Sequence, residues 1–267
     1  MGEKTDNNES IWRSIKQPLK EVVAELLSPT RCVSCERPGV LLCGACREAM
    51  VRIDPIQACM RCGAPYGRML CTECTSAEAG EGIKGGAGAG TNAPFDRCLA
   101  AAVFDGPPAR IIRAYKDAGE RRLASTIADL MYEAALTAER EAPDRYGGIL
   151  SQVDALTFVP VTAAAYRRRG FDHMELVAQA LAERAGVSCC DALAKSGHAD
   201  QRELAREERL AQSLGVYAVV APEQVKGARL LLIDDVITTG ATMKAAAPAL
   251  VKAGATHVDV LALARVW

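Results

Sequence analysis

Eight of the eleven cysteines in this chain fall in one short block, as four pairs in which two residues separate the cysteines. The pairs are Cys32/Cys35, Cys43/Cys46, Cys59/Cys62 and Cys71/Cys74. The two thiolates of a pair can turn toward one metal ion, and two pairs complete the tetrahedral coordination of a structural zinc. We therefore expect residues 30–75 to form a double zinc ribbon with two Zn²⁺ ions, because so short a segment cannot supply a hydrophobic core.

The chain lengths between the pairs leave two arrangements open. Seven residues separate the first two pairs and eight separate the last two, whereas twelve lie between the second pair and the third. Each short spacing suits a hairpin, so the simplest assembly is two sequential ribbons, and a cross-braced pairing of first with third is the alternative. A redox role is ordinary for one such pair, but four pairs in one block favour metal.

The composition limits the classes of protein that the chain can form. Hydrophobic residues make up 49% of 267 residues, which is enough for a sizeable core and excludes wholesale disorder. The net charge of −1 provides no bulk basic field for DNA or an anionic membrane. The sequence shows no apolar signal segment and no membrane-spanning run, so its many cysteines indicate a cytoplasmic chain in which disulfides do not form.

Periodicity and composition divide the rest of the chain into three segments. Apolar positions between Ile11 and Leu27 follow helical spacing, so we expect an N-terminal amphipathic helix within residues 1–29. Residues 76–94 are rich in Gly and Ala and predict a flexible linker that keeps few contacts between the ribbon and the following domain. Residues 95–267 alternate between strand and helix patterns, which predicts an α/β domain with a mostly parallel sheet.

The expected elements of this domain follow from the same patterns. Strands are expected at 98–104, 155–159, 229–233 and 257–263, and helices at 107–117, 121–140, 173–185, 201–212 and 242–252. The strand at 229–233 reads RLLLI, and a continuous apolar run of this kind indicates burial on both faces of a sheet.

Residues 229–242, RLLLIDDVITTGAT, combine an apolar strand, an acidic pair, a loop of small residues and the start of a helix. The loop residues are Thr238, Thr239, Gly240, Ala241 and Thr242. Backbone N–H groups and hydroxyls at a helix N-terminus suit a phosphate, and Asp234 and Asp235 can accept hydrogen bonds from two ribose hydroxyls. The pattern predicts a phosphorylated sugar as ligand; a helix cap with incidental carboxylates, or a metal-binding aspartate pair, is the alternative.

The full string resembles the motif by which type I phosphoribosyltransferases bind phosphoribosyl pyrophosphate (PRPP). A double zinc ribbon, a linker and such a domain together resemble the ComF family over roughly residues 30–267. Three shorter stretches add to the resemblance: Tyr115-Lys116 with Gly119; Val159-Pro160-Val161 with Arg169-Gly170-Phe171; and Gln201, Leu204, Glu208-Arg209 and Gly215.

The resemblance implies Mg²⁺-dependent transfer of a phosphoribosyl group from PRPP, with Asp234 and Asp235 on the ribose. Guanidinium groups bind phosphate oxygens bidentately, so we expect Arg167 and Arg169 to meet the pyrophosphate and to act with the acidic pair in catalysis. Lys116 is expected to reach the same phosphates. A solvated basic loop and an exposed lysine at a helix end are the plainer interpretations of these residues.

Two departures from the family pattern concern the pyrophosphate loop. Val161 is followed by Thr162 rather than a second proline, and fewer residues lie before the arginines than in the family, so the loop is shorter. Asp172 and His173 stand where the family usually has Asn-Gln. These changes bear on pyrophosphate geometry and turnover more than on PRPP binding.

The acceptor of the phosphoribosyl group is not readable from the sequence, and the segment that selects it is expected in the ribbon or in residues 107–140. A second hypothesis comes from the competence members of the family: a PRPP- or nucleotide-sensing adaptor for DNA uptake with weak catalysis. In it, the ribbon binds single-stranded DNA or a competence helicase, and the six arginines of residues 31–74 contact phosphates instead of only screening thiolates. Purine salvage is disfavoured, since a salvage enzyme does not need the ribbon.

Overall fold

The computed structural model describes residues 29–68, 70–75, 95–195 and 216–267, and it divides the chain into two compact units, Met1–Glu48 and Ala49–Trp267. The expected N-terminal helix, the linker at 76–94 and the expected helix at 201–212, with its match to the family, lie outside the described residues. The division falls between the two pairs of CxxC motifs. The second four cysteines therefore belong to the same unit as the sheet, and we describe each unit by itself.

The first unit is organised around four cysteines. Cys32 donates its N–H to the carbonyl of Arg37 at 2.8 Å, which closes the first turn, and the short helix α2 (Gly44–Glu48) begins directly after Cys43. The partly buried side chain of Leu42 packs against the buried cysteines and adds an apolar contact to them. A segment this small depends on cross-linking through its sulfurs.

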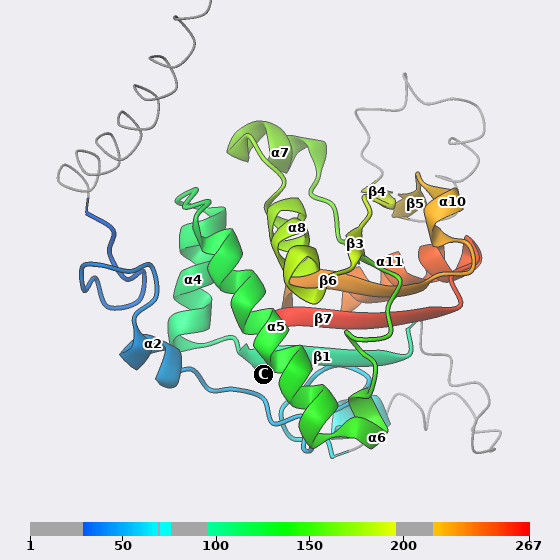
Figure 1. Ribbon diagram of the computed structural model, residues 1–267, viewed down its shortest axis with the longest axis horizontal. Helices are drawn as coiled ribbons and strands as arrows, with labels where there is room; N and C mark the ends of the chain where they lie inside the picture. The colour runs from blue at the N-terminus through cyan, green and yellow to red at the C-terminus, as the bar shows by residue number, and fades with distance from the viewer. Residues whose placement is uncertain (1–28, 69, 76–94, 196–215) are drawn as a thin grey trace, which may run out of the picture. The chain divides into compact units, whose positions relative to one another are not determined.

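The second unit is built on a five-stranded sheet in the order β1-β7-β6-β2-β3 (Figure 1). Its strands are β1 (Arg97–Val103), β7 (His257–Arg265), β6 (Arg229–Ile237), β2 (Ala155–Phe158) and β3 (Ser188–Cys189). Every neighbouring pair runs parallel, which confirms the expected parallel sheet. A separate antiparallel pair consists of β4 (Leu193–Lys195) and β5 (Tyr217–Val219).

Helices cover both faces of the sheet. Helix α5 (Leu123–Glu141) packs on β1 and β7, α8 (His173–Ala185) packs on β2 and β6, and α4 (Gly106–Lys116) lies on the same side as α5 (Figure 1). The opposite face carries α11 (Ala241–Lys252). Three short helices complete the unit: α6 (Pro143–Tyr146), α7 (Ala163–Arg169) and α10 (Pro222–Val225). No helix in the described parts of the chain is long and apolar enough to cross a membrane.

Most expected elements form within one or two residues of their predicted bounds, with two instructive differences. Strand β6 continues to Ile237, so Asp234 and Asp235 lie inside the strand rather than after its end. The arginine segment forms α7 instead of a loop, because the Thr162 hydroxyl caps the helix by accepting from the Ala165 N–H at 3.2 Å. Gly170 ends α7 in the left-handed conformation, at φ 74°.

The connections that leave β2 and β6 diverge. From β2 the chain passes through α8 to β3, whereas from β6 it passes through α11, on the other face, to β7. β2 and β6 are neighbours in the sheet, but the connection after β2 leads to one edge and the connection after β6 leads toward the other. This divergence opens a crevice at the carboxyl edge, where ligands bind in open α/β sheets.

The segment that carries the second cysteine cluster docks along the outer edge of β1. Ile53 donates its N–H to the carbonyl of Ala101 at 3.1 Å, and Val103 donates to Val51 at 2.8 Å. Residues 51–53 thus pair antiparallel with β1 and cover the hydrogen-bonding edge that the strand would otherwise expose.

Further along, the cluster itself contacts the sheet. The Cys98 N–H donates to the carbonyl of Met60 at 2.7 Å, and the Arg265 guanidinium donates to that of Cys62 at 2.9 Å. The guanidinium of Arg145 also donates to backbone carbonyls of the same segment, on residues 56 and 58. The expectation of few contacts between ribbon and sheet is therefore wrong for the second cluster.

We expect the two clusters to respond differently to loss of one ligand. Cys59→Ser removes a ligand from the cluster docked on β1 and should lower the free energy of unfolding of the sheet unit by at least about 2 kcal/mol. Cys32→Ser should cost one zinc and leave unfolding of that unit within about 0.5 kcal/mol of wild type. Urea unfolding by circular dichroism, with zinc analysis of both variants, measures this; equal losses would show that docking does not couple the second cluster to the sheet.

A buried ion pair joins β1 and β7 near their amino ends. Arg97 forms a bidentate pair with Asp259, whose side chain is fully buried, and also donates to the carbonyl of Gly147 at 2.9 Å. The imidazole of His257 lies 3.2 Å from the same carboxylate. Because the charges are removed from water, each depends on the other for its solvation.

Asp259→Asn should destabilise the protein by roughly 3–5 kcal/mol, because it leaves the Arg97 charge buried without its counterion. Glu141→Gln is the matched control: it removes a carboxylate paired with Arg140 on the surface and should change stability by less than about 1 kcal/mol. Chemical unfolding of both variants measures the difference, and similar values for the two would argue against a structural role for the buried pair.

Candidate functional site

A cavity of about 340 Å³ lies at the carboxyl ends of β2 and β6, in the crevice between the diverging connections. It is lined by the loop after β2, the end of β6, the start of α11, the end of α4 and the β4–β5 pair. Of the residues expected from the sequence to bind PRPP, six line it: Lys116, Arg169, Asp234, Asp235, Thr238 and Thr242.

The other expected residues lie outside the lining. Arg167 is exposed on α7, a helix with no buried residue. The Thr239 hydroxyl accepts from the Ala241 N–H at 3.3 Å and so shapes the turn, while Gly240 adopts the left-handed conformation at φ 72° that starts α11. Thr239, Gly240 and Ala241 therefore form the turn that brings the first N–H groups of α11 to the cavity edge, where an anion is favoured.

The acidic pair is split between the two faces of β6, because successive side chains of a strand alternate in direction. Asp234 is half-buried and accepts from the N–H of Asp235 at 2.9 Å. Burial, and next the negative charge of Asp235, raise the pKa of Asp234 to about 8. The two carboxylates are thus not equivalent, although both line the same cavity.

Asp235 is held by two neighbours. It forms an ion pair with Lys116 at the end of α4, and its Oδ2 lies 3.1 Å from Nε2 of His173. Burial alone would raise the pKa of Asp235, but the hydrogen bond with His173 and the charge of Lys116 outweigh it and lower the pKa to about 2. These two neighbours therefore favour the ionised form of the carboxylate.

Two of the three stretches that resemble the family meet at this point, although they are far apart in the sequence. The Tyr115 hydroxyl donates to the carbonyl of His173 at 2.5 Å, and its ring packs edge-on against Phe171 with centroids 5.9 Å apart. The guanidinium of Arg121 lies 4.4 Å from the centroid of the Phe171 ring. These contacts pin the end of α4 to the start of α8 and so place Lys116 beside β6.

Asp172 gives a physical reason for one departure from the family pattern. Its Oδ1 accepts from the N–H groups of Met174 and Glu175, which caps α8, and its Oδ2 accepts from the N–H of Val161 at 3.0 Å. One carboxylate therefore fixes both the helix and the loop that follows β2.

His173, Lys195 and Tyr217 also line the cavity and were not predicted from the sequence to do so. His173 follows a capping residue, so its position at a helix start was readable, but its contact with Asp235 was not. Lys195 and Tyr217 belong to strands of three residues, too short for a periodic signal, and the Lys195 ammonium lies 5.5 Å from the centre of the Tyr217 ring. The wall beside Asp234 thus includes β4 and β5. Of the two segments expected to select the acceptor, residues 107–140 contribute Lys116 to the lining and the described ribbon residues contribute none.

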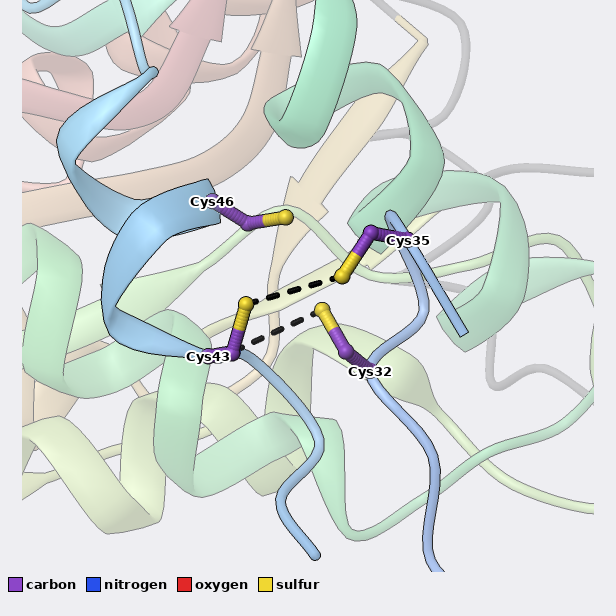
Figure 2. Close-up of side chains that lie close together, drawn as sticks. All are labelled: Cys32, Cys35, Cys43 and Cys46. Carbon is purple, nitrogen blue, oxygen red and sulfur yellow. Dashed lines mark hydrogen bonds between the residues drawn. The ribbon is translucent and has the colours of Figure 1, made fainter. Parts of the chain in front are cut away.

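The eight cysteines form two sequential four-sulfur clusters, Cys32/Cys35/Cys43/Cys46 and Cys59/Cys62/Cys71/Cys74, in each of which all sulfurs lie within 4.8 Å of one another. The sequential arrangement is confirmed, and the cross-braced alternative is wrong. Figure 2 shows the first cluster, where the sulfurs of Cys35 and Cys43 are 3.6 Å apart. Four thiolates around a tetrahedral zinc are separated by about 3.8 Å, so both sets fit structural zinc.

Glycines in the second cluster are required by close packing. A Cβ on Gly67 would lie 2.6 Å from that of Cys59, and one on Gly63, at φ 69°, would lie 3.3 Å from the sulfur of Cys98 on β1. At Gly44, in the first cluster, a Cβ would meet nothing within 4 Å. Of Gly44 and Gly63, which each lie next to a cysteine of a CxxC pair, only Gly63 is explained by contact.

Comparisons with known proteins agree with this architecture. Residues 161–266 match the phosphoribosyl transferase domain family. The chain is 25% identical over 248 residues to the DNA utilization protein YhgH of Salmonella typhi, covering 90% of this chain and 99% of that protein. It is 24% identical over 241 residues to competence protein F of Haemophilus influenzae (88% and 96%), and 34% identical over 110 residues to competence protein ComFC of Streptococcus pneumoniae (40% and 46%).

The domain match includes the strand, turn and helix that border the cavity. The relatives named YhgH and competence protein F match along nearly their whole length. This agreement, together with the two four-cysteine clusters and a parallel sheet, supports the resemblance of the chain to the ComF family.

Proposed function

We propose that the cavity binds PRPP together with Mg²⁺ and that the protein transfers the phosphoribosyl group to an acceptor that the site does not identify. One observation carries this proposal. Three kinds of group surround a single space of suitable size: a carboxylate on β6, hydroxyls and N–H groups at the start of α11, and the cations Lys116 and Arg169.

The proposed pose follows from charge and position. The 5-phosphate lies at the N-terminus of α11, near Thr238 and Thr242, where the helix dipole favours an anion. Ribose hydroxyls donate to the Asp234 carboxylate, and the pyrophosphate lies toward Arg169 and Lys116. In this pose PRPP extends from the side of β6 that carries Asp234 to the side that carries Asp235.

Catalysis by these residues consists of positioning and charge stabilisation. The bond between the anomeric carbon and the pyrophosphate oxygen breaks with oxocarbenium character, so the protein's task is to hold the sugar and to stabilise the departing negative charge. Mg²⁺, when bound with PRPP, neutralises part of that charge. Arg169 and Lys116 supply the rest from the chain itself.

We further propose that this activity serves the handling of incoming or foreign DNA in the cytoplasm. The relatives are named for DNA utilization and for competence, which supports a link to DNA uptake or natural transformation. The grouping of eight cysteines in two four-sulfur clusters supports a reducing compartment, where thiols are available to bind metal.

Titration of PRPP with Mg²⁺ by isothermal calorimetry tests the pose. Arg169→Gln should weaken binding by about 1.5–3 kcal/mol, because it removes a charged donor from the cavity. Arg167→Gln removes the same charge from the exposed face of α7 and should leave the affinity unchanged, and Asp234→Asn should reduce it by a similar amount to Arg169→Gln. Release of pyrophosphate with a panel of bases and amines then identifies the acceptor; wild-type protein that does not bind PRPP would refute the proposal.

A second candidate function is a weakly catalytic adaptor that senses PRPP or a nucleotide and binds single-stranded DNA or a competence helicase. The observation that favours it is on the second cysteine cluster, where Tyr66 is 72% exposed and Arg68, two residues on, is exposed as well. An exposed ring next to a cation is the usual platform on which unpaired bases stack.

Fluorescence anisotropy with an oligothymidine tests the adaptor. Tyr66→Ala should weaken binding by about 1–3 kcal/mol, the contribution of one stacked base. Tyr166→Ala removes another half-exposed tyrosine, on α7, and should have no effect. Equal affinities of the wild type and both variants, or no binding at all, would exclude the second cluster as a DNA-binding surface.

A further inference from the structure

We propose that the two carboxylates of the acidic pair have different tasks, and that Asp235 does not contact the ribose. Asp235 is a positioning residue that holds the two cations of the pyrophosphate half of the cavity, and Asp234 alone of the pair binds the sugar. This inference rests on the proposed function and concerns how the same site works.

The direction of the side chains along β6 is the first argument. Leu230 and Leu232 pack into the core beneath α11 together with Met243. Asp234 continues this series, two residues on, and therefore faces the α11 side of the strand. Asp235 faces the other side of the strand, where α4 ends and α8 begins.

The contacts of Asp235 are the second argument. Its side chain is 4% exposed, and its Oδ2 is engaged both by the Lys116 ammonium and by the His173 imidazole. To accept from a ribose hydroxyl it would have to exchange a charged partner for a neutral one inside the protein, which costs free energy. The lowered pKa of this carboxyl has the same origin.

The hydrogen-bonding pattern extends from Asp235 to a second cation. Nη1 of Arg169 lies 3.4 Å from Nδ1 of His173. A guanidinium can only donate, so Nδ1 accepts, the ring proton lies on Nε2, and Nε2 donates to Asp235. Asp235 thereby fixes the tautomer and orientation of His173, which in turn holds Arg169.

Asp234 has the opposite character. It has no ion-pair partner among the described residues, and the hydrogen bond it accepts, from the N–H of Asp235, occupies Oδ1. It lines the cavity on the side of Tyr217 and the start of α11. An oxygen of its carboxyl group is therefore placed to accept from the sugar without breaking an ion pair.

Calorimetry with three probes separates the two tasks: PRPP with Mg²⁺, inorganic pyrophosphate with Mg²⁺, and ribose 5-phosphate. Asp235→Asn should weaken pyrophosphate and PRPP by about 10-fold or more and change ribose 5-phosphate by less than about 2-fold. Asp234→Asn should show the reverse selectivity, losing ribose 5-phosphate and PRPP while pyrophosphate binds as to wild type.

Two further variants keep the inference falsifiable if Asp235→Asn folds poorly. His173→Gln retains one acceptor and one donor and should preserve pyrophosphate affinity, whereas His173→Leu should lose it about as much as Asp235→Asn does. In a double-mutant cycle, Lys116→Met combined with Asp235→Asn should weaken pyrophosphate no further than either change alone, because both break one unit. Circular dichroism confirms that each variant measured is folded.

The outcomes are distinct. If wild type binds PRPP but Asp235→Asn loses ribose 5-phosphate and keeps pyrophosphate, Asp235 is a ribose ligand and this inference alone is refuted. Equal affinity of His173→Gln and His173→Leu for pyrophosphate would also refute the role of His173. If wild type binds neither PRPP nor pyrophosphate, the proposed function fails and the inference fails with it.

Discussion

The parallel pairing of β2 with β6 is the constraint on which the rest of the sheet unit depends. Their backbone hydrogen bonds bring two strands about 75 residues apart in sequence into register, from Ala155 opposite Leu230 to Phe158 opposite Ile233. Because the helices that follow these strands lie on opposite faces, the chain must part at their carboxyl ends. The cavity, the turn before α11 and the contact between α4 and α8 all lie at this parting.

The second cysteine cluster is a structural part of this unit rather than an appended ribbon. Residues 51–53 cover the edge of β1, and Arg145 and Arg265 bind carbonyls of the cluster's backbone. A metal site that closes the edge of a sheet does what an additional strand or helix would otherwise do. The two cysteine clusters of one chain therefore belong to different compact units, although their sequence spacing is nearly the same.

Much of the fold was readable because long periodic segments report burial directly. The strand at 229–233 and the helix at 173–185 formed where the apolar pattern placed them, and the two sequential clusters followed from loop lengths. Short elements were missed: β3, β4 and β5 have two or three residues each, too few to show a period. Helix α7 was missed because three arginines suggested a solvated loop, whereas the Thr162 cap and the alanines after it favour a helix.

The sequence by itself determined the chemistry available to this protein: eight thiolates in pairs, a strand with an acidic pair, a glycine turn and a set of cations. Tertiary structure alone decided which of these groups act together, since side chains that are neighbours in a strand point to opposite faces, while Lys116 and His173 reach Asp235 from distant helices. Adjacency along a strand separates Asp234 from Asp235, and packing of α4 against α8 joins residues that no spacing in the sequence connects.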